Sequence, residues 1–310
     1  MTLVKATEQH QPVLVEEVLA TLAVRHDGIY VDCTFGRGGH AREILKRMGD
    51  KGQLLAMDRD PQAVVAAQDL AADPRVTFRR GSFAALAHFV EALGCMGRVN
   101  GVLFDLGVSS PQLDQAERGF SFQREGRLDM RMDTTTGITA GQWLARVTEE
   151  ELADCLRRYG EERYARRIAR AVIAARRGRP IITTRELAEI VARAHPAWQR
   201  GQHPATRTFQ AIRILINDEL NQLKQGLVQA LTVLAVGGRL LVISFHSLED
   251  RVVKQFMRHE SGRSPRGDLP TAPFAARLRV IGKALKPRPE EIRANPRAHS
   301  AILRAAEKLA

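Results

Sequence analysis

The chain has 310 residues, 44% of them hydrophobic, which is enough for a sizeable core, and its net charge of +12 favours a polyanionic partner, with RNA or DNA ahead of a membrane surface. Its three widely spaced cysteines argue against a disulfide framework or a structural zinc site and indicate a reducing cytoplasm. We expect no signal peptide and no membrane-spanning helix, because the sequence contains neither apolar pattern.

The first clear pattern is a strand, a glycine turn and a helix over residues 29–48. A β-branched and aromatic run ends in Asp32, and a glycine-rich turn follows at residues 36–39. A second apolar run, residues 53–57, ends in Asp58. Half-units of this kind bind nucleotides, and an acid about 20 residues beyond the glycines can accept hydrogen bonds from ribose hydroxyls. The pattern therefore predicts a cofactor with an adenosine-like ribose.

Two further apolar runs continue the alternation of strands and helices. Residues 76–79 read as a strand with Ser82 and Phe83 at its exit, and residues 101–105 read as a buried strand that ends in Asp105. Such alternation predicts a parallel sheet covered on both faces, which binds ligands beyond the carboxyl ends of its strands. We therefore expect four polar strand exits on one rim, at Asp32, Asp58, Ser82–Phe83 and Asp105. Phe83 could flank an adenine ring there, or it could be an ordinary core aromatic residue.

From about Thr148 the sequence becomes helical and basic. Residues 157–179 contain nine arginines against two glutamates. Four arginines spaced i, i+3, i+4 and i+7 are predicted to share one helix face: Arg163, Arg166, Arg167 and Arg170. A charged face of this kind is either solvated or in contact with RNA phosphates, and the scarcity of acids favours phosphate contacts.

The strand pattern resumes at residues 239–245 and ends in a strand pair at residues 277–285 and 300–308. A gap of about 100 residues between strands is too long for a structureless loop, so we expect the intervening helices to form a small domain of their own. The organisation is thus one α/β domain interrupted by a helical, basic insertion. A Gly-, Pro- and Arg-rich loop at residues 261–274 carries no inference.

The identity of the cofactor depends on Asp32. Residues 36–41 match the dinucleotide fingerprint G-x-G-x-x-A only loosely, which leaves NAD and S-adenosylmethionine as alternatives. A carboxylate at the end of the first strand would repel a pyrophosphate, but it suits the cationic methionine end of S-adenosylmethionine. The charge pattern therefore favours S-adenosylmethionine.

Eight ordered segments resemble the signatures of the RsmH (MraW) family. The resemblance runs from His10 to Arg297, and its one unusual position is Cys33, where a small residue is usual. The segments are Asp32–His40, Asp58–Pro61, Asp105–Gln112, Glu117–Phe122, Leu128–Asp133, Tyr159–Arg163, His203–Gln210 and Ser244–Arg251.

The resemblance implies a Rossmann-like class I methyltransferase sheet with an inserted all-α substrate-recognition domain. The methyltransferase domain would comprise residues 1–137 and 209–310, and the inserted domain residues 138–208. The implied reaction is methyl transfer from S-adenosylmethionine to N4 of a decoding-site cytidine of 16S ribosomal RNA in the small subunit. The protein would be cytoplasmic, without a membrane partner, and a monomer or homodimer. The cofactor would contact Asp32, Gly38, Gly39, His40, Asp58, Phe83, Asp105 and Gln112.

The groups that orient the cytosine amine are the least specified part of the site. Many amino-methyltransferases carry an Asp/Asn-Pro-Pro-aromatic motif after the fourth strand, but only the acid, Asp105, is kept here. We hypothesise that Ser109 and Ser110 orient the amine while Asp105 chiefly serves the cofactor; alternatively, the serines only shape a turn. His246 is more readily a helix-capping or packing residue than a substrate contact.

Two further pairs of residues and two alternative functions of the protein are also considered. Phe120 and Phe122 could stack on an extruded base or form a small core of their loop. Asp129 and Asp133 are weak evidence for a metal, and we expect none. An NAD-dependent oxidoreductase and a non-catalytic RNA-binding protein are the alternative functions, and the charge at Asp32 and the polar strand rim, respectively, argue against them.

Overall fold

The computed structural model describes residues 12–197, 203–262 and 275–310. It contains two compact units, an α/β unit formed by Met1–Gly107 and Gln222–Ala310 and a helical unit formed by Val108–Asn221. None of the helices in the described ranges is long and apolar enough to span a membrane. The loop at residues 263–274 and the start of the family resemblance at His10 lie outside the described residues.

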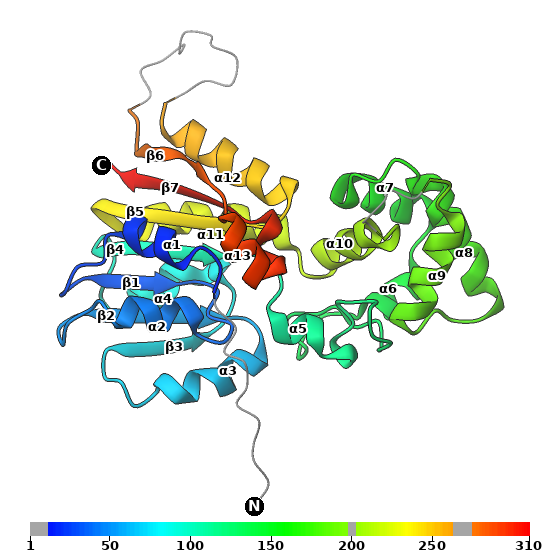
Figure 1. Ribbon diagram of the computed structural model, residues 1–310, viewed down its shortest axis with the longest axis horizontal. Helices are drawn as coiled ribbons and strands as arrows, with labels where there is room; N and C mark the ends of the chain where they lie inside the picture. The colour runs from blue at the N-terminus through cyan, green and yellow to red at the C-terminus, as the bar shows by residue number, and fades with distance from the viewer. Residues whose placement is uncertain (1–11, 198–202, 263–274) are drawn as a thin grey trace, which may run out of the picture. The chain divides into compact units, whose positions relative to one another are not determined.

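The α/β unit is built on a seven-stranded sheet in the order β3-β2-β1-β4-β5-β7-β6 (Figure 1). Strands β1 to β5 pair in parallel, whereas β7 runs antiparallel to both of its neighbours. The strands are β1 (Ile29–Asp32), β2 (Gln53–Asp58), β3 (Val76–Arg80), β4 (Val99–Asp105), β5 (Leu234–Ser244), β6 (Leu278–Leu285) and β7 (Ile302–Lys308). This confirms the predicted α/β class, the parallel strands that end in acids and the final strand pair.

Helices cover both faces of this sheet because its central strands are apolar on both sides. Successive residues of a strand point to opposite faces, so Leu54 belongs to one buried core and Leu55 to the other. One face is covered by α1 (Val15–Leu22), α2 (Gly39–Leu45) and α3 (Pro61–Ala67). The other is covered by α4 (Leu86–Glu91), α11 (Glu219–Val233) and α12 (Ser247–Glu260). A short helix, α13 (Pro289–Ala294), precedes β7.

The helical unit has a separate apolar core. Its helices are α5 (Ser110–Asp114), α6 (Ala140–Arg146), α7 (Glu149–Gly160), α8 (Ala165–Gly178), α9 (Thr184–Ala194) and α10 (Ala205–Ile216). Capping boxes begin α7 at Thr148 and α9 at Thr183, where the hydroxyls accept hydrogen bonds from Glu151 and Glu186 N–H groups. Both helix starts follow from the sequence alone.

The compact helical unit is larger than the insertion expected at residues 138–208. On its N-terminal side, Leu128 and Met130 are buried in the same core as the helices, and Leu128 N–H donates to Ile182 C=O at 3.0 Å. On its C-terminal side, α10 contributes Phe209 and Ile212 to that core. The boundaries therefore lie at residues 107/108 and 221/222, whereas the functional division into catalytic and substrate-binding domains stays a prediction.

Candidate functional site

The glycine turn after β1 is tied to the end of β2. Gly36 (φ 54°) and Gly38 (φ 75°) adopt left-handed backbone, which glycine tolerates without strain. A Cβ on Gly38 would lie 2.7 Å from the Phe35 ring, so the turn has room only for glycine. Phe35 N–H donates to Met57 C=O at 2.8 Å. The turn is thus fixed against the strand that carries Asp58.

Asp58 is the acceptor that organises this turn. Its Oδ2 accepts from Gly36 N–H at 2.7 Å, and its Oδ1 accepts from Asp60 N–H at 2.8 Å. Burial raises the pKa of Asp58 to about 6 in spite of these two bonds, which favour the carboxylate. The side chain therefore lies at the strand end where the sequence predicted a ribose-binding acid.

A second cluster joins the ends of β1 and β4 to helix α2. The side chain of Asp32 is 1% exposed, and its Oδ1 accepts from Thr34 N–H at 3.1 Å. His40, on α2, places Nε2 3.5 Å from Oδ2 of Asp105. Asp105 N–H in turn donates to Thr34 Oγ1 at 2.6 Å. The structure thus brings together three of the side chains expected at the cofactor.

The electrostatics of this cluster favour positive charge. Burial is the main cause that raises the pKa of Asp32 to about 6, against the charge of His40 and the hydrogen bond from Thr34 N–H, which lower it, and with smaller upward contributions from the charges of Asp105 and Asp58. Burial opposes protonation of His40, but the hydrogen bond and charge of Asp105, with the charge of Asp32, raise its pKa overall. Uncompensated buried carboxylates are stabilised by a cation placed between them.

Two buried polar atoms of the cluster have no hydrogen-bond partner among the described residues. Within the described part of the chain, Nδ1 of His40 and Oδ1 of Asp105 are buried and make no hydrogen bond. Leaving a buried polar group unsatisfied costs about 1–3 kcal/mol. These donor and acceptor atoms fit a ligand that carries both an ammonium and a carboxylate group, as the methionine end of S-adenosylmethionine does.

Phe83 lies beyond β3 and has a packing role. Its ring meets Phe104 edge-on with 5.3 Å between centroids. Gly226 of α11 passes so close that a Cβ there would lie 2.8 Å from the Phe83 ring. Ser82 caps the short turn by accepting from Ala84 N–H at 3.1 Å. Phe83 is therefore a half-buried residue at the edge of the core, and contact with an adenine stays a prediction.

Ser109, Ser110 and Gln112 belong to the helical unit, where they begin α5. Ser109 is the N-cap residue, and its N–H donates to Oε1 of the buried Gln112 at 2.9 Å. Pro111 follows within the first turn of the helix, which its fixed φ favours. The turn-shaping role considered for the serines is thus present, and their roles toward cofactor and substrate stay predictions.

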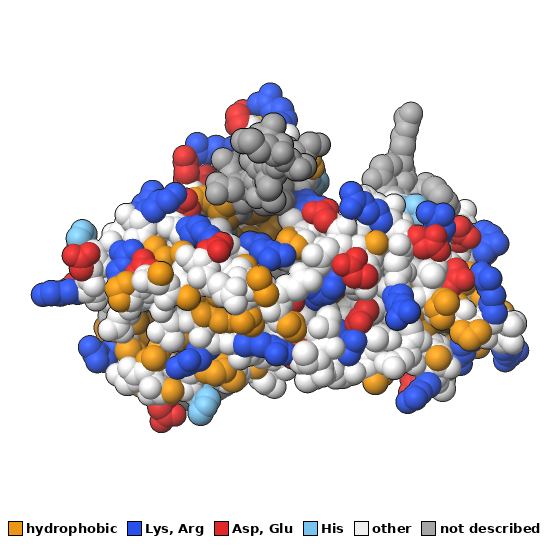
Figure 2. Space-filling view, turned by 90° about the horizontal axis from the view of Figure 1, so that it is seen from below, with side chains coloured by type: hydrophobic (Ala, Val, Ile, Leu, Met, Phe, Trp, Pro, Cys, Tyr) orange, Lys and Arg blue, Asp and Glu red, His pale blue; other side chains and the backbone are white. Residues whose placement is uncertain are grey.

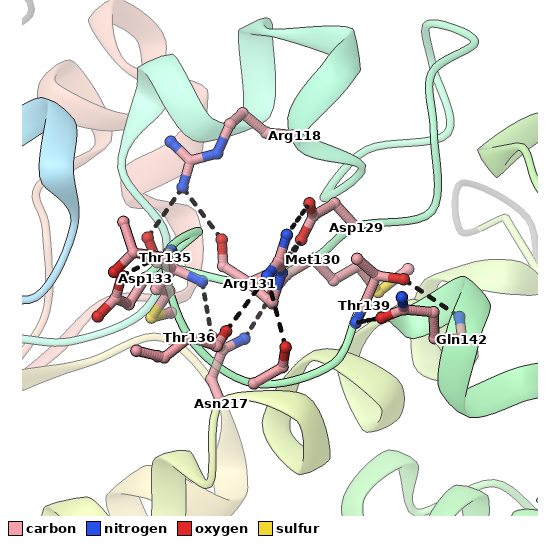
Figure 3. Close-up of polar contacts among 12 residues, drawn as sticks. Arg118, Asp129, Met130, Arg131, Asp133, Thr135, Thr136, Thr139, Gln142 and Asn217 are labelled. Carbon is pink, nitrogen blue, oxygen red and sulfur yellow. Dashed lines mark hydrogen bonds and ion pairs between the residues drawn. The ribbon is translucent and has the colours of Figure 1, made fainter.

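The loop before α6 is held by two buried side chains (Figure 3). Asn217 accepts from Met132 N–H and donates to Met130 C=O, both at 2.7 Å. Arg118 donates to the carbonyls of Arg131 and Met132, both at 3.1 Å. Met130 adopts φ 62°, a backbone conformation that costs a non-glycine residue energy and persists only where the surroundings impose it.

The two acids considered for a metal have other partners in this loop. Asp129 forms a bidentate ion pair with Arg131, at 2.7 and 2.8 Å. Asp133 accepts from Thr135 N–H at 2.9 Å and from its hydroxyl at 2.6 Å. These contacts give both carboxylates a local structural role (Figure 3).

Comparison with known proteins identifies the family. The model of the MraW methylase family matches residues 7–309, nearly the whole chain. The chain belongs to the MraW methylase family. It is 61% identical over 300 residues to the "Ribosomal RNA small subunit methyltransferase H" of Methylococcus capsulatus, covering 96% of this chain and 100% of that protein. It is 55% identical to the protein of the same name from Shewanella oneidensis, covering 97% of each.

Among solved structures, this MraW methylase family member is similar to a putative rRNA methylase from Clostridium thermocellum. The TM-score is 0.44 and the sequence identity is 13%, over 96% of this chain and 93% of that one.

The basic segment of this family member differs from its prediction at one residue. Arg166, Arg167 and Arg170 are exposed on α8, but Arg163 precedes that helix. The prediction of one helix face for all four was therefore wrong for Arg163. The helical backbone is interrupted between α7 and α8, because Glu161 ends α7 with φ 48° and Glu162 Oε1 accepts from Tyr164 N–H at 2.8 Å.

Only part of this arginine surface is paired with acids. Arg170 lies 3.5 Å from Glu149, whereas Arg166 and Arg167 form no ion pair or hydrogen bond with any described residue. Figure 2 shows Lys and Arg side chains spread over the visible face rather than in one dense patch. Phosphate contacts by these arginines stay a prediction.

Three aromatic or histidine residues of this family member have packing or capping roles. His246 is the N-cap residue of α12, and its Nδ1 accepts from Glu249 N–H at 3.4 Å, which confirms the capping interpretation. Phe120 is buried in the helical core, with Arg118 5.7 Å from its ring centroid. Phe122 packs against the ring of Phe209 at 4.9 Å.

Sequence reasoning missed three residues that organise these regions. Thr34 links Asp32 to Asp105 through the two hydrogen bonds described above. Its position between an acid and a glycine turn was a usable signal. Arg118 and Asn217 gave no local signal, because Arg118 meets its loop partners 13 and 14 residues away in the sequence and Asn217 meets its partners 85 and 87 residues away.

Proposed function

We propose that this chain transfers a methyl group from S-adenosylmethionine to the exocyclic N4 of a decoding-site cytidine in 16S ribosomal RNA. The observation that carries the proposal is the acid-lined strand rim of Asp32, Asp58 and Asp105 in a member of the MraW methylase family. The names of the curated relatives support small-subunit ribosomal RNA as the substrate.

The residues of the rim fit S-adenosylmethionine better than a dinucleotide. When bound, S-adenosylmethionine supplies an electrophilic methyl group on a positively charged sulfur. Asp58 would hold the ribose hydroxyls, and Asp32, His40 and Asp105 would hold the charged methionine end. Gly38 and Gly39 keep the backbone open beside it, while Phe83 and Gln112 are the further contacts that we propose.

Acceptance of the methyl group requires control of the cytosine amine. Its lone pair is delocalised into the ring, so an acceptor must hold the amine hydrogens and draw the nitrogen toward sp³ geometry. Fixed dipoles perform this task without a strong base. We assign it to the carbonyls or hydroxyls of Ser109 and Ser110, with Asp105 serving the cofactor. Single-turnover methylation by a Ser109→Ala/Ser110→Ala variant at the wild-type rate would remove their hydroxyls from catalysis.

The RNA partner accounts for the charge of the chain. The net charge of +12 and the exposed arginines of α8 suit a substrate dense in phosphates. We therefore assign substrate binding to the helical unit and place the reaction in the cytoplasm, where small subunits are found. Action as a monomer or a homodimer stays a prediction.

The proposal is tested by methyl transfer to small ribosomal subunits from a strain that lacks the modification. S-adenosylmethionine with a tritiated methyl group is added, and the RNA is digested and separated into nucleosides. We expect the label in N4-methylcytidine from one decoding-site position, and none from subunits that already carry the modification. Label in another nucleoside, or no transfer at all, would overturn the proposal.

A further inference from the structure

A cavity of about 430 Å³ lies in the α/β unit between α12 and the antiparallel strands β6 and β7. Figure 1 shows α12 alongside these two strands at the end of the sheet. Its volume falls within the usual range of about 300–1,000 Å³ for small-ligand sites. β6 lies three strands from β4, and strands in a sheet are about 4.8 Å apart, so β6 is about 14 Å across the sheet from the strand that carries Asp105.

The edge strand β6 is bulged where it forms one wall of the cavity. Its pairing with β7 shifts register between Ile281 and Leu285. Gly282 takes φ 60° inside the bulge, a conformation that a glycine adopts without strain. Bulges redirect side chains at sheet edges, and here the redirected residues, Lys283 and Ala284, line the cavity.

Four cations and no acid line this cavity. Lys254 and Arg258 come from α12, Lys283 from the bulge and Arg304 from β7. Lys254 and Lys283 are exposed and form no hydrogen bond or ion pair with any residue in the described ranges. The floor is apolar and includes the buried Met257.

The acids close to the cavity are already paired. Asp250 holds Arg304 through two bonds, at 2.7 and 3.0 Å. Glu260 is paired with Arg277 at 2.6 Å. Because these carboxylates are neutralised by their own partners, they do not offset the charge of Lys254 and Lys283, and the cavity mouth is positive.

We propose that this cavity binds a phosphodiester segment of the RNA substrate, at a contact separate from the methyl-transfer rim. The inference rests on the proposed function. Lysine ammonium groups act as point charges toward phosphate, and the apolar floor accommodates the face of a sugar or base. The cavity thus holds the substrate at the sheet edge while the cytidine is presented elsewhere.

The test is a charge-neutralised variant, Lys254→Gln/Lys283→Gln, with Lys51→Gln/Lys224→Gln as the matched control. The control pair is also exposed on the α/β unit and forms no ion pair or hydrogen bond with a described residue. Binding to unmodified small subunits is measured over a range of salt concentrations. Each phosphate contact contributes about 0.7–0.9 to the magnitude of the slope of log K against log [salt]. Loss of two contacts should therefore reduce the slope of the cavity variant by about 1.6, whereas the slope of the control should not change.

Kinetics and a steric variant separate a binding contact from other roles. We expect the KM for subunits to rise about tenfold in the cavity variant, with kcat and S-adenosylmethionine affinity unchanged and a Lys254→Arg/Lys283→Arg variant close to wild type. Ala284→Trp fills the cavity without changing charge, and its KM should rise as well.

The outcomes distinguish the two proposals. The cavity assignment is overturned if the neutralised variant keeps the wild-type salt slope and KM, or if the control pair loses as much of the slope. The proposed function is unaffected by either result as long as the wild-type protein methylates the subunits. If the wild-type protein neither binds nor methylates the subunits, the proposed function fails, and the cavity assignment fails with it.

Discussion

The strand-end rim and the loop before α6 are both dense in polar contacts, but Asp58 of the rim and Asn217 of the loop form their bonds over different distances in the sequence. At the rim, Asp58 bonds to N–H groups 22 residues before it and two after it. In the loop, Asn217 bonds to residues 85 and 87 positions away. Short-range contacts leave a motif that can be recognised in a sequence, whereas long-range contacts are visible only in the fold.

The largest expected effect is at the rim, from Asp58→Asn. The amide keeps one acceptor oxygen but places an NH₂ group against one of two backbone donors, Gly36 N–H or Asp60 N–H. Hydrogen bonds to charged groups contribute about 1.5–3 kcal/mol each, so S-adenosylmethionine affinity should fall about 100-fold. Calorimetric titration of the variant and the wild-type protein with S-adenosylmethionine measures this affinity.

Asp60→Asn is the matched control for that substitution. Asp60 caps α3 by accepting from Gln62 N–H at 2.9 Å, and asparagine caps helices equally well. Affinity within threefold of wild type is expected. Equal losses in both variants would mean that the turn, rather than Asp58 itself, limits binding.

The corresponding break in the loop is Asn217→Ala. Removal of this 2%-exposed amide leaves Met132 N–H and Met130 C=O without their partner. Each unsatisfied buried group costs about 1–3 kcal/mol, so the free energy of unfolding of the helical unit should fall by about 3 kcal/mol. Chemical denaturation measures the change in the free energy of unfolding, and hydrogen exchange in residues 118–142 shows whether the loop is the part that is weakened.

Asn221→Ala is the control for the loop substitution, because Asn221 is exposed and bonds to Asp218 of its own turn at 2.7 Å. It should change stability by less than about 0.5 kcal/mol. S-adenosylmethionine affinity should stay at the wild-type value in both variants. A loss of affinity in Asn217→Ala would show that the two regions depend on each other.

A subtler change at the rim, Asp32→Asn, should improve stability while it impairs binding. The folded-state pKa of about 6 exceeds the ordinary 3.8, so the stability that a protonated Asp32 provides is lost as pH rises from about 4 through 6. At pH 7 the buried charge is therefore a cost, about 3 kcal/mol for a shift of two units at 1.36 kcal/mol each. The amide removes it, and we expect a higher Tm for the ligand-free protein.

The same shift predicts how cofactor binding depends on pH. Protonation of Asp32 and Asp58 near pH 6 removes the negative charge that attracts a cationic ligand. S-adenosylmethionine affinity should therefore fall as pH is lowered from 7 to 5, and Asp32→Asn should flatten the part of the profile due to Asp32. A wild-type profile with no slope over this range would contradict the assignment.

These contrasts explain how much the sequence could reveal. The strands, their terminal acids and the glycine turn were predictable because each is encoded within a few residues. The boundary of the helical unit was not, because Leu128 and Met130 occur in a polar loop and are buried only once α9 and α10 have folded around them. Arg163 was misplaced because the break at Glu161 interrupts an otherwise regular helical pattern.

The smallest expected effect concerns the exposed arginines of the helical unit. Arg166→Gln/Arg167→Gln should lower the salt dependence of subunit binding by 1.4–1.8, at about 0.7–0.9 for each phosphate contact. Arg157→Gln/Arg158→Gln on α7 is the control, since both arginines are already paired with Asp154 at 2.7 and 3.5 Å. An unchanged slope in the first variant would assign its arginines to solvent.

The central claim is that the acids of the strand rim select a cationic adenosine cofactor. Calorimetric titration of the wild-type protein with S-adenosylmethionine and, separately, with NAD tests it most directly. We predict one S-adenosylmethionine bound per chain and no measurable binding of NAD under the same conditions. Binding of NAD as tight as that of S-adenosylmethionine, or tighter, would contradict the account.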